Sequence, residues 1–103
     1  MSWADTYIEK LKKGETVEFR PRGNSMVPHV NSKELVRVSP VKPTTLKKGD
    51  IVLCRVSGKD YLHLISAIKK NSFQISNAKG RVNGTTKTIY GKLVSLPERK
   101  ILD

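Results

Sequence analysis

The spacing of the apolar residues changes once along the chain, at Gly14, and this change constrains the fold more than any other feature of the sequence. Before Gly14, the apolar residues are Trp3, Tyr7, Ile8 and Leu11, which recur with the spacing of one face of a helix. After it, they alternate with polar residues or form short runs between turn signals, as strands do. We therefore expect a mainly β protein with a short N-terminal helix.

The expected helix covers residues 3–13. Ser2 can cap it, because Asp5 stands three residues further on, in the position of a capping box. The glycine that follows residue 13 can end it. We expect Trp3 and Tyr7 to pack in the core rather than to bind a ligand.

Six strand segments are expected after the helix, at residues 17–19, 35–38, 51–56, 61–68, 73–75 and 88–96. Turn signals separate them, at residues 48–50, 57–60, 69–71 and 83–84. The turn at 57–60 joins two apolar runs, which predicts a β-hairpin there. These short strands favour a small, folded-over, barrel-like β structure.

The length of 103 residues suits one domain with a modest core, so we expect a single domain over residues 1–103 with its helix in residues 1–14. No run of about 18 apolar residues occurs, and the first residues lack the basic start and apolar stretch of a secretory signal. We expect a soluble, cytoplasmic protein. The one cysteine, Cys54, lies in an apolar run, which predicts a buried thiol without a disulfide or a metal.

The formal charge is +11, from 20 Lys and Arg against 9 Asp and Glu. Such an excess favours contact with nucleic acid, an anionic lipid surface or an acidic protein. The basic residues are scattered, however, and form only small pairs, at 12–13, 47–48 and 69–70. A highly charged, solvated surface explains them equally well, so the charge alone leaves both interpretations open.

The segment RPRGNSMVPHV, residues 20–30, places Ser25 between a flexible glycine and a stiff proline, Gly23 and Pro28. A nucleophilic serine needs an exposed hydroxyl on a rigid turn, with backbone amides free to hold an oxyanion. The same residue types also form ordinary turns. The segment alone therefore leaves catalysis and a plain turn as equal alternatives.

A nucleophilic serine also needs a base, for which the candidates are His63, His29 and the lysines. His63 lies in an apolar strand segment, where histidine is more often a half-buried structural residue. His29 is only four residues from Ser25, too close along a turning chain to face its hydroxyl well. No lysine lies within the apolar runs, where burial could lower its pKa enough for a base.

Four segments, in order, resemble boxes of the signal-peptidase/LexA-type serine peptidase superfamily. GNSMVP, residues 23–28, is similar to its nucleophile box, in which Gly, any residue, Ser, Met, any residue and Pro recur. LKKGDIVLCR, 46–55, resembles the second box, and YLHLISAI, 61–68, falls where that superfamily places its base. YGKLVSL, 90–96, resembles the closing strand. The resemblance covers about residues 17–96.

This resemblance implies that Ser25 is the nucleophile and His63 the general base, as in the histidine-type members, with their closest heavy atoms within about 4 Å. The Ser25 amide and a neighbouring amide or hydroxyl would form the oxyanion hole, while Met26 would pack below the nucleophile and shape the cleft. Gly49 and Asp50 would form a structural turn. The implied function is a serine endopeptidase that takes a peptide as an added strand, without a cofactor.

The sequence also departs from the superfamily pattern. Leu64 follows His63, where these members usually have Arg, and Ser76-Asn77 stands where a Gly-Asp usually orients the base. Asn77 could hold the ring but could not stabilise an imidazolium by charge. Residues 31–34 replace the usual Pro-Gly-Asp. The first two departures predict either a slow peptidase or a fold that has lost proteolysis.

The alternative is a non-catalytic basic module that binds nucleic acid or an acidic protein through the same β surface. Few aromatic residues are available for stacking on single strands, so nucleic-acid binding would be weak and of the backbone type. Small stand-alone members of the superfamily often occur in phages and mobile elements, and the resemblance is compatible with such an origin.

Overall fold

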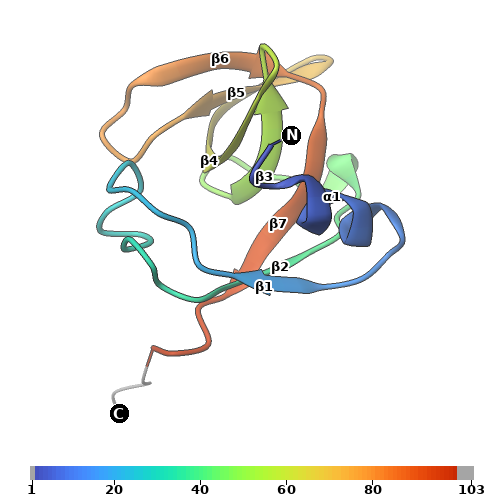
Figure 1. The fold of residues 1–103 in the computed structure, drawn as a ribbon. Coiled ribbons are helices and arrows are strands. Elements are labelled where there is room, and N and C mark those ends of the chain that lie inside the picture. Colours follow the sequence, from blue (N-terminus) through green and yellow to red (C-terminus); the bar gives the residue numbers. More distant parts are fainter. Residues whose placement is uncertain (1, 100–103) are drawn as a thin grey trace.

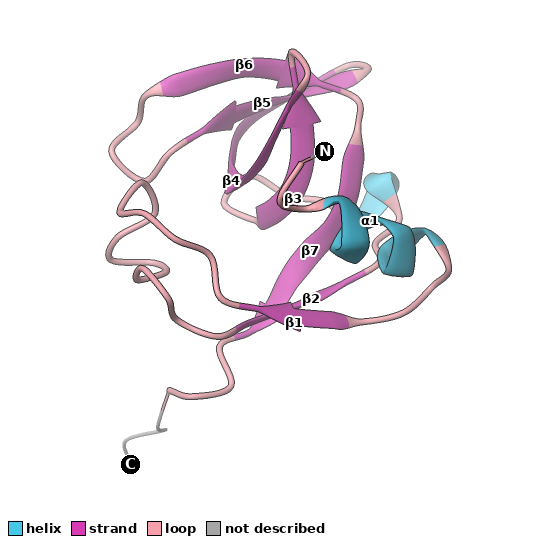
Figure 2. Cartoon of the chain, viewed as in Figure 1, coloured by secondary structure: helices cyan, strands magenta, loops and turns pink. Residues whose placement is uncertain are grey.

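The computed structural model describes residues 2–99, and its strands form one antiparallel sheet behind a short helix (Figures 1 and 2). The mainly β class and the N-terminal helix predicted from the sequence are confirmed. The elements are α1 (Asp5–Lys12), β1 (Val17–Phe19), β2 (Val36–Ser39), the 3-10 turn η1 (Pro43–Thr45), β3 (Ile51–Val56), β4 (Lys59–Lys69), β5 (Ser72–Ser76), β6 (Val82–Thr86) and β7 (Ile89–Ser95).

The strands are ordered β1-β2-β7-β3-β4-β5-β6 in the sheet, and all neighbours are antiparallel. The sheet curls, so that its edge strand β6 returns towards β3 (Figure 1). The hydroxyl of Thr86 donates to the carbonyl of Arg55, and the Arg55 N–H donates to the carbonyl of Thr88 at 3.1 Å. These contacts tie the end of β6 and the residue before β7 to β3.

The predicted hairpin is present between β3 and β4. Its turn has two residues, Ser57 and Gly58, which both have positive φ, at 49° and 81°. This conformation matches the twist of the flanking strands. Gly91 in β7 is required for another reason: a Cβ there would lie 2.7 Å from the carbonyl oxygen of Ser39 in β2.

Helix α1 begins at Asp5, two residues later than the sequence predicts. The prediction that Ser2 caps the helix is wrong, because Ala4 occupies the position before α1, but the Ser2 N–H does donate to the Asp5 carboxylate at 3.0 Å. The Ser2 hydroxyl, however, accepts from Ala4 at 3.3 Å and so closes a turn before the helix. Tyr7 packs against the core as predicted. The same prediction is wrong for Trp3, which is 52% exposed.

Two apolar clusters lie on opposite sides of β3. Leu53 belongs to the cluster that packs against α1, whereas Val52 and Cys54 belong to the other. Both faces of β3 are therefore buried, which explains the continuous apolar run in its sequence. Burial raises the pKa of the Cys54 thiol to about 12, with a smaller contribution from the charge of Asp60, so this cysteine is an inert core residue as predicted.

The sequence predicts a turn at Asn83-Gly84, but this pair lies inside β6, a strand that the sequence does not predict. Ile75 pairs with Gly84 and Ser76 with Val82, so Asn83 is an extra residue, a β-bulge. Gly84 has a φ of 143°, which glycine adopts readily. The turn signal thus marks a bulge and not a chain reversal.

Within residues 2–99, no helix is long and apolar enough to cross a bilayer.

Candidate active site

Ser25 lies in the loop of residues 20–34, which connects β1 to β2. Its side chain is exposed, but the next residue, Met26, is only 5% exposed. Val30 is also buried, and its N–H donates to the Met26 carbonyl at 2.9 Å. Gly23 has a φ of 109°, a conformation that favours glycine. The loop therefore presents the Ser25 hydroxyl from a turn anchored in the core.

A second contact fixes Ser25 relative to the sheet. Its carbonyl accepts a hydrogen bond of 2.9 Å from the N–H of Ala78, which lies between β5 and β6. The loop is thus held beside the segment that follows β5. This brings the serine next to β4, the strand that pairs with β5.

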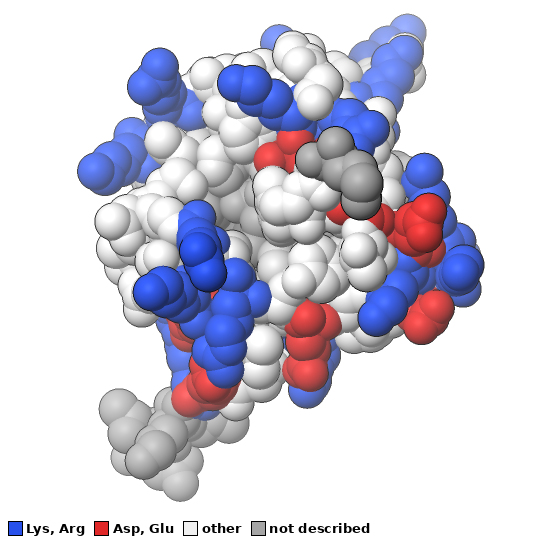
Figure 3. Space-filling view, viewed as in Figure 1, with Lys and Arg blue, Asp and Glu red and all other residues white. Residues whose placement is uncertain are grey.

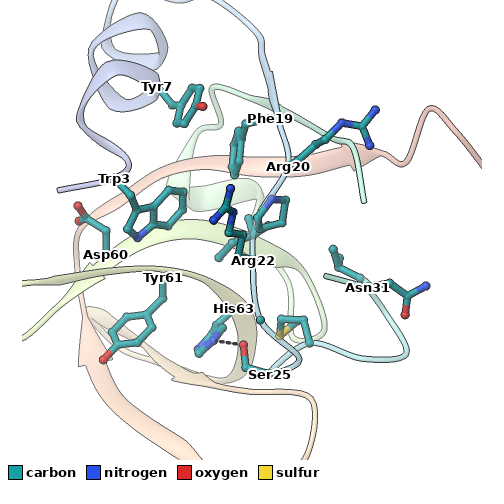
Figure 4. A pocket seen from close by; sticks show the side chains of 15 residues that line it. Trp3, Tyr7, Phe19, Arg20, Arg22, Ser25, Asn31, Asp60, Tyr61 and His63 are labelled. Atoms are coloured by element: carbon teal, nitrogen blue, oxygen red, sulfur yellow. Dashed lines mark hydrogen bonds between the residues drawn. The ribbon is translucent and has the colours of Figure 1, made fainter. Parts of the chain in front are cut away.

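His63 projects from β4 towards Ser25, and its Nε2 lies 3.0 Å from Ser25 Oγ (Figure 4). The two residues are 38 positions apart in the chain, and the contact is within the 4 Å that the sequence predicts. His63 is 7% exposed. His29 is exposed and is not among the residues that line the pocket described below, in agreement with the expectation that it does not face the Ser25 hydroxyl.

Asn83 holds the other side of the His63 ring, with its Oδ1 at 2.7 Å from His63 Nδ1. An amide oxygen only accepts hydrogen bonds, so in this arrangement Nδ1 carries the proton. Nε2 is then unprotonated and faces the Ser25 hydroxyl. The ring therefore has the tautomer and the direction that a general base needs.

The sequence-based assignment of Asn77 as the residue that orients the base is wrong. Its Oδ1 accepts from the N–H groups of Lys79, at 3.0 Å, and Arg81, at 2.9 Å, and so closes the turn before β6. Asn residues commonly make such turns. The ring of His63 is instead engaged by Ser25 and by Asn83, which occupies the bulge position of β6.

Burial lowers the pKa of His63, and the hydrogen bond that His63 donates to Asn83 offsets this only in part. The ring of Tyr61, two residues earlier on β4, lies against it, with 4.9 Å between the ring centroids. Burial thus favours the neutral form of His63, which is the form that can accept a proton.

Two backbone donors are available beside the Ser25 hydroxyl. Among residues 2–99, neither the Ser25 N–H nor the Met26 N–H has a hydrogen-bond acceptor. An oxyanion hole needs donors of this kind close to the attacking oxygen. The Ser25 N–H is also the donor that the superfamily resemblance implies.

A pocket of about 540 Å³ extends from Ser25 and His63 to α1 (Figure 4). Aromatic rings line its far end, where Phe19 stacks on Tyr7 with centroids 4.5 Å apart and lies 5.7 Å from Trp3. On the face shown in Figure 3, Lys and Arg lie mainly towards the periphery and uncharged atoms fill most of the middle. The pocket can thus accommodate apolar side chains of a bound molecule.

Comparisons of the chain with protein-family models, with curated proteins and with solved structures gave no match.

Proposed function

We propose that this protein is a serine endopeptidase of the signal-peptidase/LexA type, with Ser25 as nucleophile and His63 as general base. The observation that carries this proposal is the chain of contacts from Ser25 Oγ to His63 Nε2 and from His63 Nδ1 to Asn83. Two further features support it, namely the free N–H groups at Ser25 and Met26 and the adjoining pocket.

In the first step, Ser25 Oγ attacks the carbonyl carbon of the scissile peptide bond while His63 Nε2 takes the hydroxyl proton. The N–H groups of Ser25 and Met26 stabilise the oxyanion. His63 then donates the proton to the leaving amine, and an acyl-enzyme remains. Water, deprotonated by the same nitrogen, hydrolyses the ester and restores Ser25.

Asn83 keeps the ring oriented through these steps but supplies no negative charge to the imidazolium. A carboxylate in this place stabilises the protonated ring, whereas an amide only fixes its tautomer. We therefore expect a slow peptidase, which agrees with the departures from the superfamily pattern.

The edge of β4 offers a place for the substrate backbone. The hairpin turn has two residues, so the residue pair that flanks it is hydrogen-bonded. Hydrogen-bonded and non-hydrogen-bonded pairs then alternate along β3 and β4. The backbone N–H and C=O of His63 are thus hydrogen-bonded to β3, whereas those of Leu62 point away from β3. β5 pairs with β4 only from Leu64 onward, and Leu62 lines the pocket. An extended peptide can add to this edge beside Ser25.

The acid limb of the pH–rate profile is expected to lie below pH 6.5, the ordinary pKa of histidine, because burial lowers the pKa of His63. Catalysis needs the neutral ring, so kcat/KM should stay constant as pH falls to about 6.5 and decline only below it. Measuring kcat/KM for one peptide between pH 4.5 and 9, a range set by the ordinary histidine pKa, checks this. An acid limb centred above 6.5 contradicts the assignment of His63 as the base.

Asn83→Asp is expected to raise the rate at pH 8 by at least about tenfold, because the new carboxylate stabilises the imidazolium. It should also raise the pKa of His63, so the acid limb moves to higher pH. Asn77→Asp is the matched control and should leave both unchanged, since Asn77 does not contact the ring. An increase with Asn77→Asp alone would reverse our assignment of the two asparagines.

One observation favours the alternative, a binding module for nucleic acid. Residues 61–97 contain no Asp or Glu but six basic residues, Lys69, Lys70, Lys79, Arg81, Lys87 and Lys92. Among the described residues, Lys92 is the only one of the six in an ion pair, with Asp50 at 3.4 Å.

Duplex DNA titrated at several salt concentrations tests this function. Nucleic-acid binding is supported if the affinity falls steeply with salt, if Ser25→Ala has the same salt dependence, and if Lys69→Gln/Lys70→Gln has a weaker one.

A further inference from the structure

Arg22 lies three residues before Ser25 and lines the pocket from the loop. It is exposed, and Figure 4 shows its guanidinium group on the side of the loop that faces Trp3. Arg20, two residues earlier, points in the opposite direction in the same view. The two arginines of the RPRG segment therefore have different surroundings.

The other charged groups that line the pocket are already paired. Arg20 makes two hydrogen bonds to the carboxylate of Glu98. Asp60 pairs with Arg55, with 2.7 Å between Oδ1 and Nε, and its side chain is only 1% exposed. Arg55 also holds the pKa of Asp60 below its ordinary value, so this carboxylate stays ionised and paired.

Arg22 differs from these residues. None of the ion pairs formed among residues 2–99 includes it. The ionised residues around the pocket thus leave one positive charge without a partner, next to the proposed nucleophile. A guanidinium group presents a planar set of donors that fits a carboxylate with two parallel hydrogen bonds.

We propose that Arg22 is a specificity-determining residue that binds a carboxylate of the substrate, so that the enzyme prefers acidic peptides. This inference rests on the proposed peptidase function and names the substrate class of that site. Three residues of chain span at most about 10 Å, so the carboxylate should lie within about three residues of the scissile bond. The carboxylate is either a Glu or Asp side chain or the C-terminal group of the peptide.

The test uses synthetic peptides in matched pairs that carry Glu or Gln at one position near the cleaved bond, each with a free or an amidated C-terminus. Cleavage is followed by mass spectrometry. We expect the wild type to cleave Glu peptides with at least about tenfold higher kcat/KM than Gln peptides, because a charged hydrogen-bonded pair is worth more than a neutral one. Arg22→Gln should remove this preference, and Arg22→Glu should instead favour a Lys peptide.

Two controls separate a local contact from overall charge. Arg20→Gln removes the same charge from the same loop, and Lys69→Gln/Lys70→Gln removes charge from a turn that does not line the pocket. Both should keep the Glu preference. A preference that depends on the free C-terminus alone supports the carboxylate site and identifies the terminal group as its ligand. Equal rates in the wild type for Glu and Gln peptides and also for free and amidated C-termini, or a preference that persists in Arg22→Gln, overturn the proposal.

Binding measurements distinguish this proposal from the peptidase function. Trp3 is the one tryptophan of the chain, is 52% exposed and lines the pocket, so its fluorescence reports on occupancy. In Ser25→Ala, Glu peptides should bind more tightly than Gln peptides, and the added change Arg22→Gln should abolish the difference. If this holds while the wild type cleaves no peptide, the carboxylate site stands and the peptidase function fails. Cleavage without any difference in binding between Glu and Gln peptides or between free and amidated C-termini overturns the carboxylate site alone.

Discussion

Replacing Ser25 with Ala, or His63 with Ala, is expected to lower peptide cleavage by at least about 10³-fold. Ser25→Ala removes the attacking oxygen, and His63→Ala removes the group that accepts its proton. Because the two side chains act as one unit, the double variant should be no slower than either single variant. Mass spectrometry of peptide products measures all three rates.

Controls for these variants come from the same chain. His29→Ala removes the other histidine, which is exposed and outside the pocket, and should leave the rate unchanged. Ser25 is exposed, but its hydroxyl contacts the buried His63, so Ser25→Ala should lower the free energy of unfolding by no more than about 2 kcal/mol. If a correctly folded His63→Ala variant keeps more than a tenth of the activity, or if Ser25→Ala is active, the dyad does not carry the reaction.

Leu53→Ala is expected to destabilise the fold by about 3 kcal/mol, the largest loss of stability that we predict. Leu53 is fully buried in β3, between Leu62 of β4 and Gly91 of β7. Its truncation leaves a cavity in the cluster that joins the sheet to α1. Chemical denaturation measures the free energy of unfolding. Ile68→Ala removes a similar side chain that is 49% exposed and should cost less than about 1 kcal/mol.

The contrast between these two variants tests the arrangement of the sheet. Equal losses for Leu53→Ala and Ile68→Ala would contradict the burial of Leu53 in the cluster that packs against α1. A large loss for Leu53→Ala alone agrees with the buried position of β3. This packing also matters for the site, because β3 pairs with β4 opposite His63.

The elements with clear periodicity could be predicted from the sequence. The run 51–56 became β3 with the same bounds, and the helix and the hairpin also formed where they were expected. In these places local preference and tertiary packing favour the same structure. The approach of Ser25 to His63 was predictable because the order of the sequence boxes indicated which two segments meet.

Asn83 could not be identified in the same way. Its contact with His63 depends on a bulge between β5 and β6, and that bulge is set by the pairing of two strands and not by the Asn-Gly pair itself. An Asn-Gly pair between apolar segments is a strong hairpin signal, and the sequence gives no sign that it is overridden here. Asn77 lies nearby in the sequence, but its side-chain oxygen accepts a hydrogen bond within the turn before β6.

The same limit applies to the charges around the pocket. The sequence contains Arg20 and Arg22 in one short segment, with nothing to tell them apart. Arg20 is neutralised by Glu98, which lies 78 residues away, so only the folded chain shows which arginine lacks a partner among the described residues. The exposure of Trp3 also depends on packing, because its helical spacing predicts a buried position.

The activation of Ser25 by His63 is the central claim, and covalent labelling with a fluorophosphonate tests it most directly. The reagent reacts with serines that a neighbouring base activates. We predict a single adduct, assigned to Ser25 by peptide mass spectrometry and greatly slowed in His63→Ala, while the exposed Ser32 of the same loop stays unmodified. No adduct at Ser25, or the same labelling rate in the wild type and His63→Ala, would contradict the account.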